Sequence, residues 1–180
     1  IDGSGKSTQI NLLKKLFTKK NIKFMITREP GGTNLSEKQV NNKNFFTFEG
    51  IDGSGKSTQI NLLKKLFTKK NIKFMITREP GGTKFSEKLR KLILNSSENL
   101  SFQSEVLLLY AARIEHIEKK IKPALKENYI VISDRYYDST LAYQGYGYGY
   151  NKNFINYIDS LIDLRPKKTF WIDTPVKTCM

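Results

Sequence analysis

A glycine-rich segment at residues 50–57 (GIDGSGKS) places the strongest constraint on how this chain can fold. Its spacing matches G-x-x-x-x-G-K-[ST], in which glycines let backbone N–H groups point into one concavity around a polyphosphate. A β-prone run at 45–48 precedes it, and residues 56–70 follow it with apolar side chains at helical spacing. The sequence therefore predicts a strand, a phosphate-binding loop and a helix in that order. A glycine-rich turn without phosphate chemistry is the alternative.

Each residue type in this loop has a chemical reason. Lys56 offers a movable cation for phosphate groups, and Ser57 offers a hydroxyl group to Mg²⁺. The N-terminus of the following helix adds its partial positive charge. The expected phosphate-binding residues are Gly50, Gly53, Ser54, Gly55, Lys56, Ser57 and Thr58.

The chain contains an internal repeat, because residues 1–33 recur identically at 51–83. Two identical copies indicate a recent duplication, since a solenoid would show at least three units that vary. The first copy of the loop, at 2–7 (DGSGKS), lacks the leading glycine and the β-prone run of the second. We expect residues 1–43 to be a duplicated partial segment without function and residues 44–180 to form the working domain. We expect the chain to be a fragment or a damaged gene product. A natural or designed tandem repeat is the alternative.

Strands and helices are expected to alternate along the rest of the chain, which predicts a parallel sheet with helices on both faces. Residues 129–133 (YIVIS) form a continuous apolar run, as expected for a strand buried on both faces. The other expected strands are 72–77 and 169–173, and the expected helices are 86–94, 104–120, 138–144 and 151–164, with a further turn from Pro123. The predicted fold class is a three-layer α/β fold of the P-loop type.

The net charge of +14 lies mostly in the first hundred residues, largely as lysines on the expected helices. A solvated basic helix face is the favoured interpretation. Nucleic-acid binding is the alternative, but the basic residues lack interleaved aromatics and a recognised DNA or RNA motif. We expect no membrane span, because no stretch approaches ~20 consecutive apolar residues. The one cysteine, Cys179, cannot form an internal disulfide bond, which predicts a reducing, cytoplasmic compartment.

Four stretches of the sequence closely resemble bacterial thymidylate kinases (dTMP kinases) when taken in order. They are 48–58 (FEGIDGSGKST), 77–83 (TREPGGT), 109–113 (LYAAR) and 134–145 (DRYYDSTLAYQG). The resemblance runs from about residue 44 to residue 180. It implies a nucleoside monophosphate kinase fold, transfer of the ATP γ-phosphoryl group to dTMP giving dTDP, and a homodimer.

The resemblance also implies roles for individual residues. Lys56 and the loop amides would hold the ATP phosphates, and Ser57 and Asp134 would serve Mg²⁺, Asp134 through water. Asp52 would sit between the metal and the acceptor nucleotide, so the implied catalytic residues are Lys56, Arg135 and Asp52. The implied dTMP-binding residues are Arg78, Glu79, Arg113, Arg135, Ser139, Thr140, Tyr143 and Gln144.

Simpler interpretations remain open for several of these residues. Arg113 is also typical of a helix surface, Asp134 and Arg135 are also typical of a structural ion pair, and Tyr143 is also typical of a core. His116 lies in the run 115–118 (EHIE), and we expect it to face solvent and to have no functional role.

The sequence departs from the family pattern at three points, one of which is Tyr148, where relatives often carry an arginine. Leu109 stands where relatives often carry a phenylalanine that stacks on thymine. The family also continues beyond the expected strand at 169–173 into a lid, which supplies an arginine, and into an adenine-contacting segment. An arginine acting on the transferring phosphate can be worth ~10³–10⁵ in rate. A catalytically inactive nucleotide-binding remnant is therefore the alternative to an active kinase.

Overall fold

The computed structural model describes residues 24–27, 42–95, 100–149 and 151–179. Within these residues the chain forms five strands that hydrogen-bond into one sheet. In sheet order they are β1 (Phe24–Thr27), β5 (Lys168–Ile172), β2 (Phe45–Glu49), β4 (Ile130–Asp134) and β3 (Phe74–Arg78). The first copy of the repeat, apart from β1, lies outside the described residues, and so does the loop at 2–7.

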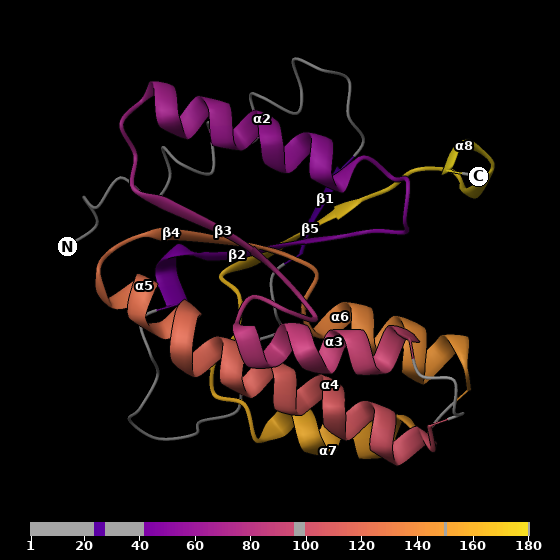
Figure 1. Cartoon of the computed structure of the whole chain (residues 1–180). Helices are drawn as coiled ribbons and strands as arrows, with labels where there is room; N and C mark the ends of the chain where they lie inside the picture. Colours follow the sequence, from indigo (N-terminus) through magenta and orange to yellow (C-terminus); the bar gives the residue numbers. More distant parts are fainter. Residues whose placement is uncertain (1–23, 28–41, 96–99, 150, 180) are drawn as a thin grey trace.

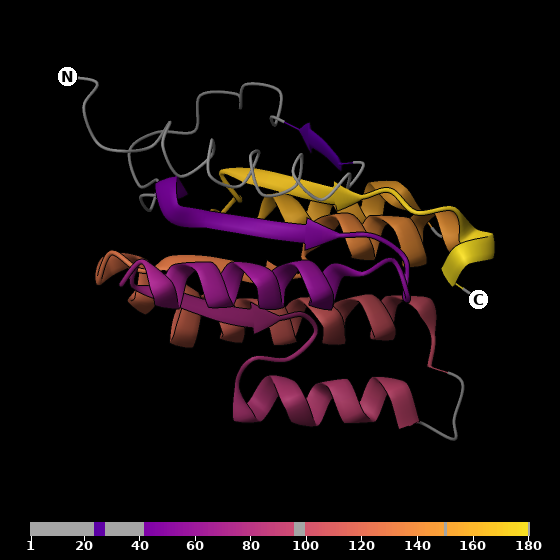
Figure 2. The same ribbon diagram turned by 90° about the horizontal axis from the view of Figure 1, so that it is seen from above.

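The sheet is parallel from β5 through β2 and β4 to β3, as the sequence predicts. The edge strand β1 departs from this pattern, because it pairs antiparallel with β5. Figure 2, seen from above, shows β1 running against the direction of β2, β3 and β5. The carboxyl ends of the four parallel strands therefore share one edge of the sheet, where ligand chemistry collects in α/β folds.

Helices cover both faces of this sheet (Figure 1). The helix α2 lies on one face, and the helices α3 to α7 lie on the other, which confirms the three-layer α/β class. The helical segments are η1 (Asn42–Asn44), α2 (Lys56–Lys69), α3 (Lys84–Asn95), α4 (Phe102–His116), η2 (Ile117–Ile121), α5 (Lys122–Lys126), α6 (Tyr137–Thr140), η3 (Leu141–Gly147), α7 (Lys152–Ser160) and α8 (Val176–Cys179).

Two hydrophobic cores form because alternate side chains of the central strands point to opposite faces of the sheet. The core beneath α2 contains Phe46, Phe48, Ile60, Leu63, Phe67, Ile130, Ile132, Phe170 and Ile172. The core on the other face contains Phe45, Val106, Tyr110, Ile117, Ile121, Leu125, Val131, Tyr136, Ile155, Ile162 and Leu164. Burial on both faces explains why the central strands read as continuous apolar runs in the sequence.

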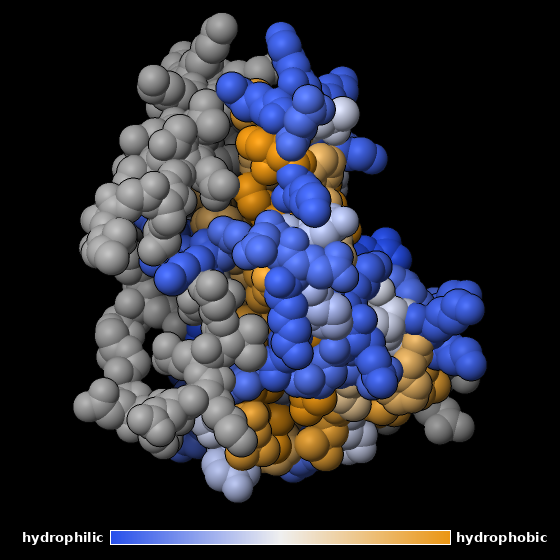
Figure 3. All heavy atoms as spheres, turned by 90° about the vertical axis from the view of Figure 1, so that its left-hand side faces the viewer, coloured by the Kyte–Doolittle hydropathy of each residue, from blue (hydrophilic) through white to orange (hydrophobic). Residues whose placement is uncertain are grey.

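The helix α2 is amphipathic, and its basic residues lie on the outside. Ile60, Leu63 and Phe67 are buried against the sheet, whereas Lys64 and Lys65 are exposed. Figure 3 shows hydrophilic residues on the outer side of this helix and hydrophobic residues between it and the sheet. This arrangement agrees with the interpretation of its lysines as a solvated basic face.

The helix predicted at 104–120 is part of a longer continuous helical segment, 102–126, whose hydrogen-bonding pattern changes along its length. It begins after Ser101, whose hydroxyl oxygen accepts from the Ser104 N–H (3.3 Å). Pro123 has no N–H to donate to the preceding turn. Just before it, η2 takes up π-helical bonding, and the Lys122 N–H donates to the Ile117 carbonyl. The helical segment then continues through α5.

The helix predicted at 151–164 ends earlier, at Ser160. Arg165 folds back, donates from Nη2 to the Asp159 carbonyl (2.9 Å) and forms an ion pair with the Asp159 carboxylate. That carbonyl is one that a continued helix would use internally. Ile162 and Leu164 leave the helix and are buried in the core.

The helix predicted at 138–144 is split in the structure between α6 and the π-helical segment η3. None of the helices in the described ranges combines the length and the apolar character that a bilayer crossing needs.

Candidate active site

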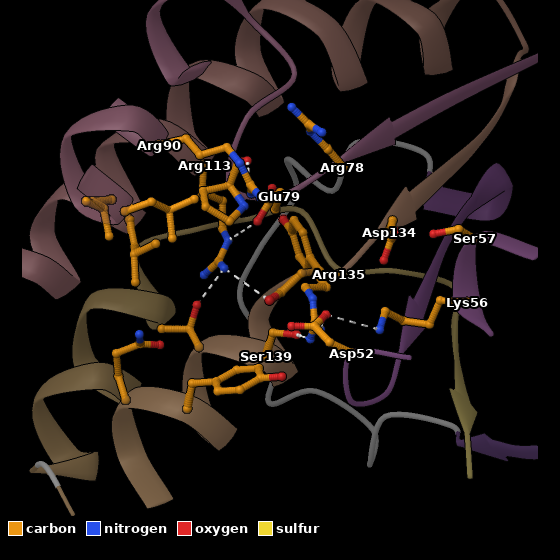
Figure 4. A pocket seen from close by; sticks show the side chains of 18 of the residues that line it. Asp52, Lys56, Ser57, Arg78, Glu79, Arg90, Arg113, Asp134, Arg135 and Ser139 are labelled. Atoms are coloured by element: carbon orange, nitrogen blue, oxygen red, sulfur yellow. Dashed lines mark hydrogen bonds and ion pairs between the residues drawn. The ribbon is translucent and has the colours of Figure 1, made fainter. Parts of the chain in front are cut away.

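A cavity of about 850 Å³ lies at the carboxyl ends of β2, β3 and β4 (Figure 4). Most of the predicted site residues line it, although they come from four separate stretches of the chain. Those lining it are Asp52, Gly53, Gly55, Lys56, Ser57, Thr58, Arg78, Glu79, Arg113, Asp134, Arg135, Ser139, Thr140, Tyr143 and Gln144. Gly50 and Ser54 are the two predicted residues that do not belong to the lining.

Gly50 instead lies at the point where β2 passes into the phosphate loop. Its φ is 147°, and a Cβ there would lie 2.8 Å from the Ser54 hydroxyl oxygen and 2.9 Å from the Ile172 carbonyl oxygen. Any side chain would therefore collide with the loop and with β5. The leading glycine of the motif is explained by this close packing.

Lys56 begins α2, and its ammonium group is held across the loop. It donates to the carbonyl oxygens of Gly50 (2.7 Å) and Ile51 (2.8 Å). The Lys56 side chain is buried, and burial, followed by the Arg135 charge, lowers the pKa of its ammonium group. Both hydrogen-bond acceptors of this buried cation are neutral carbonyls, and the nearest carboxylate oxygen among the described residues, on Asp52, is 4.0 Å away. The cation therefore favours an anionic ligand, because phosphate oxygens would stabilise its charge more strongly.

Asp52 links the phosphate loop to the end of β4. Its Oδ1 accepts from Arg135 Nη2 (2.6 Å) and lies 4.0 Å from Lys56 Nζ. The hydrogen bond from Arg135 lowers the pKa of the Asp52 carboxyl group. Asp52 and Arg135 thus meet across 83 residues of sequence, and Asp134 is not the ion-pair partner of Arg135.

Arg135 is held from several sides. Its φ of 71° is a left-handed conformation, which is costly for a residue other than glycine. The Arg135 N–H donates to Phe48 O (2.9 Å), and its Nη1 donates to Ser139 Oγ (3.0 Å). Its guanidinium also lies 5.2 Å from the centre of the Tyr143 ring. Tyr143 is 42% exposed, so the interpretation of Tyr143 as a core residue is wrong.

Glu49 is a functional candidate that the sequence did not reveal. It ends β2, and its carboxylate accepts from the Tyr136 N–H (2.7 Å) and from Ser139 Oγ (2.5 Å). Burial raises the pKa of the Glu49 carboxyl group to about 7. Glu49 thereby supports the same Ser139 hydroxyl that meets Arg135. Its position, directly before the leading glycine, was the available signal.

The residues from 77–83 and α4 form a second buried group. Arg113 Nε donates to Glu79 Oε2 (2.6 Å), and both side chains are 4% exposed. Arg113 Nη2 donates to Tyr136 O (3.1 Å) and Thr140 Oγ1 (2.8 Å). Arg113 is therefore not a helix-surface residue. Its Nη1 is buried without a partner among the described residues.

His116 corrects an expectation, because it is buried and not exposed to solvent. Its Nε2 lies 2.6 Å from Thr77 Oγ1, and its Nδ1 lies 3.2 Å from Glu79 Oε1. The buried stripe of α4 runs through Val106, Leu109, Arg113 and His116 at helical spacing. This spacing was present in the sequence and could have shown that His116 faces inward.

Arg78 and Gln144, which are also predicted to bind dTMP, line the same cavity and are hydrogen-bonded to glutamates. Arg78 is half-exposed and donates to Glu87 Oε2 (2.9 Å), and Gln144 Nε2 donates to Glu105 Oε1 (2.8 Å). An apolar wall comes from Ile93, Leu94 and Leu109. This combination suits a planar group with polar edges.

Arg90 is a further lining residue that the sequence analysis missed. It projects from α3 and donates from Nη1 to the Pro80 carbonyl (3.1 Å). With Arg78, Arg113 and Arg135 it forms what we call the arginine cluster (Figure 4). Its signal in the sequence was a second arginine, 12 positions after Arg78, on a predicted helix. Four guanidinium groups around one cavity favour phosphate binding.

Ser57 and Asp134 both line the cavity beside Lys56, and in Figure 4 the Ser57 hydroxyl group is directed toward Asp134. Asp134 Oδ1 is buried and has no hydrogen-bond partner in the described part of the chain. Burial raises the pKa of the Asp134 carboxyl group, and the Lys56 charge opposes this effect. An orphaned carboxylate oxygen beside a hydroxyl group fits a hard divalent cation such as Mg²⁺. The described residues contain no group of three or more His, Cys, Asp or Glu side chains that would bind a metal by themselves.

Comparisons with known proteins agree with this arrangement. The family profile described as Thymidylate kinase matches residues 1–41 and 48–180. The thymidylate kinase of Carboxydothermus hydrogenoformans is 48% identical over 179 residues, covering 97% of this chain and 63% of that protein. The thymidylate kinase of Geotalea daltonii is 45% identical over 180 residues, covering 98% and 61%. The chain thus spans about three fifths of the length of these curated relatives.

A solved structure extends the comparison to three dimensions. The crystal structure of thymidylate kinase from Ehrlichia chaffeensis matches with a TM-score of 0.66 at 45% sequence identity, and the match covers 74% of each chain. The phosphate loop, the shared fold and the extent of the profile match lead to one conclusion: the chain belongs to the thymidylate kinase family.

Proposed function

We propose that the protein transfers the γ-phosphoryl group of ATP to dTMP and releases ADP and dTDP, a step of dTTP biosynthesis. One observation carries the proposal: a single cavity joins the phosphate loop at one end to the arginine cluster at the other. The two ends suit two nucleotides whose phosphates meet near Asp52 and Arg135. The names of the relatives, all thymidylate kinases, supply the identity of the acceptor.

In this mechanism the protein positions and neutralises phosphates and does no covalent chemistry. Lys56 would exchange its two carbonyl acceptors for phosphate oxygens of ATP. Arg135, held by Asp52 and Ser139, would stabilise charge on the acceptor side. Arg78, Arg90 and Arg113 would orient the dTMP phosphate and base, and the apolar wall would contact the thymine ring.

Mg²⁺ fits the site through Ser57 and Asp134, whose orphaned Oδ1 is available to the metal or to a water bound to it. The small number of protein ligands suits Mg²⁺, which keeps several waters and binds mainly through substrate phosphates. The ion would supply charge neutralisation on the transferring phosphoryl group.

The experiment measures ADP release from Mg·ATP with and without dTMP, using the whole chain. The internal repeat provides a matched control, because Lys56 and Lys6 stand in identical local sequences. Lys56→Ala is expected to lower dTMP-dependent turnover by about 10²–10³. Lys6→Ala is expected to leave it unchanged, since we propose that residues 44–180 carry the site and residues 1–43 do not.

Two outcomes would contradict the proposal. Equal losses from Lys6→Ala and Lys56→Ala would place the first loop in the reaction. Binding of both nucleotides by folded wild-type protein without ADP release would favour the inactive nucleotide-binding remnant. A binding titration with DNA or RNA over increasing salt addresses the remaining class, and we expect no specific binding.

We also propose a cytoplasmic homodimer. Half-exposed apolar residues follow one side of each of two neighbouring helices, Phe85 and Leu92 on α3 and Leu107 and Ile114 on α4. Apolar stripes of this kind on a small domain support association with a second copy. The single cysteine supports a reducing compartment.

A further inference from the structure

His116 is a buried imidazole that lies next to the cavity without lining it. It comes one helical turn after Arg113 on the same buried stripe of α4. The proposed mechanism assigns it no step. Its contacts, however, are with the segment 77–82, which carries Arg78 and Glu79 of the acceptor end.

Three residues of the segment 77–82 touch this one ring. Thr77 and Glu79 meet its two nitrogens, at 2.6 Å and 3.2 Å. Gly82 packs directly against it, because a Cβ at Gly82 would lie 2.4 Å from the His116 Cδ2 and Nε2 atoms. The φ of Gly82 is 92°, so glycine is required there for both reasons. The imidazole therefore anchors the segment that carries Arg78.

The same ring completes the bonding of the Glu79–Arg113 pair. Glu79 Oε2 accepts from Arg113 Nε, which leaves Oε1 in need of a donor. His116 Nδ1 is placed to be that donor. A buried carboxylate is tolerated only when its oxygens are paired. With Glu79 satisfied and Nη2 bonded to Tyr136 and Thr140, only Nη1 of Arg113 is left for a ligand.

The bonding pattern also selects one tautomer of the ring. A carboxylate can only accept, so Nδ1 carries the proton toward Glu79. The neutral ring then has an accepting Nε2, and the Thr77 hydroxyl group donates to it. Thr77 does not line the cavity, and its hydroxyl group bonds to this ring and not to the acceptor end directly.

We propose that His116 is a positioning residue for the acceptor nucleotide: it holds Glu79, and through Glu79 it fixes the guanidinium of Arg113, a residue that lines the cavity. This inference rests on the proposed function. It adds a determinant of acceptor affinity that never touches the nucleotide itself.

Two substitutions separate positioning from general stability. In His116→Asn the amide nitrogen replaces Nδ1 and retains the bond to Glu79, whereas in His116→Gln it replaces Nε2 and loses that bond. Each variant loses one buried hydrogen bond, so both should be destabilised to a similar degree. We expect His116→Gln to weaken dTMP binding by about tenfold, because Arg113 is no longer held, and His116→Asn to weaken it by less than about threefold. Binding of ATP should be unchanged in both.

The measurement is calorimetric titration of the whole chain with dTMP and, separately, with Mg·ATP. Equal dTMP affinity in wild type and both variants overturns the inference. A loss of dTMP affinity in His116→Asn as large as in His116→Gln, with ATP affinity unchanged, also overturns it, because the bond to Glu79 would then not be the cause. A parallel loss of dTMP and ATP affinity in both variants reports unfolding, and the Thr77 variants then decide. If the wild-type protein itself binds no dTMP, the proposed function fails whatever the variants do.

Thr77 provides a second route if the His116 variants do not fold. Thr77→Val keeps the strand-forming shape but removes the donor to Nε2, and Thr77→Ser retains the hydroxyl group. We expect Thr77→Val to raise the KM for dTMP without raising the KM for ATP. We expect Thr77→Ser to keep the wild-type KM for dTMP. Identical KM values for dTMP in wild type and Thr77→Val contradict the inference.

Discussion

The Glu49 carboxyl group is buried between β2 and the start of α6, close to the charged end of the cavity. Burial raises its pKa to about 7; the hydrogen bond from Ser139 opposes this, and the Asp138 charge reinforces it. Smaller opposing effects come from the Tyr136 amide and the Arg135 charge. Glu49 therefore changes its charge near neutral pH while bonded to residues that support Arg135.

The sign of the pH dependence follows from the raised pKa. Between the ordinary value of 4.5 and the folded value of about 7, the folded chain keeps a proton that the unfolded chain releases. The free energy of unfolding must therefore fall as pH rises through this window and level off above it. A pKa rise of this size corresponds to about 3 kcal/mol.

Glu49→Gln tests this prediction, because glutamine imitates the protonated carboxyl group. Urea unfolding at pH 5, 6, 7 and 8 should show a smaller decrease in stability for the variant than for wild type. The other buried carboxyl groups with raised pKa values, Asp134, Asp138 and Asp159, are present in both proteins, so the difference isolates Glu49. Parallel pH profiles would show that Glu49 does not titrate in this range.

At the scale of single elements, the start of α7 is held by a side-chain cap that contributes to stability. Asn151 Oδ1 accepts from the N–H groups of Asn153 (3.0 Å) and Phe154 (3.4 Å). These bonds satisfy donors that the first helical turn cannot satisfy internally. The cap holds Phe154 and Ile155 against α4 and the core, away from the cavity.

Asn151→Ala should therefore lower the free energy of unfolding by about 1 kcal/mol. Asn151→Asp is the matched control, because aspartate caps helices as well as asparagine. Thermal or urea unfolding measures both variants, and nucleotide binding at low temperature should be the same in each. A stability loss in Asn151→Asp as large as in Asn151→Ala would show that the cap bonds are not the cause.

At the scale of the whole molecule, the apolar stripes on α3 and α4 determine the expected assembly. Leu107 is 48% exposed and lies centrally on the α4 stripe. Leu161 is 66% exposed but lies after α7, outside both stripes. A buried charge at an association surface is strongly unfavourable, whereas a charge at a solvated position is nearly neutral.

Sedimentation analysis should therefore find Leu107→Glu shifted from dimer to monomer, and Leu161→Glu unchanged. A wild-type protein that sediments as a monomer at all concentrations would refute the homodimer. A dimer that survives Leu107→Glu would place the interface elsewhere on the molecule.

The site shows why some functional residues can be predicted from the sequence and others cannot. The loop residues follow a motif in which adjacent backbone geometry creates the chemistry, so spacing alone predicted them, whereas the role of Arg135 was implied by the resemblance to the family. Glu49, Arg90 and His116 each carried a local signal, but their hydrogen-bond partners lie 87, 10 and 39 positions away, and the local signal does not identify those partners. Their roles emerged only when the fold brought those partners within hydrogen-bonding distance.

One four-residue sequence, Phe-Met-Ile-Thr, separates the structural features that local sequence determines from those that it does not. It occurs at 24–27 and at 74–77, and it is a strand in both places, because its aromatic and β-branched residues favour extended backbone. The sequence by itself therefore determined strand formation, as it determined the phosphate loop and the order of elements. The first copy pairs antiparallel with β5 and the second pairs parallel with β4, at opposite edges of the sheet. Identical residues cannot encode two directions, so tertiary structure decided direction and neighbour: α2 returns the chain for a parallel strand, and the free edge of β5 accepts the other.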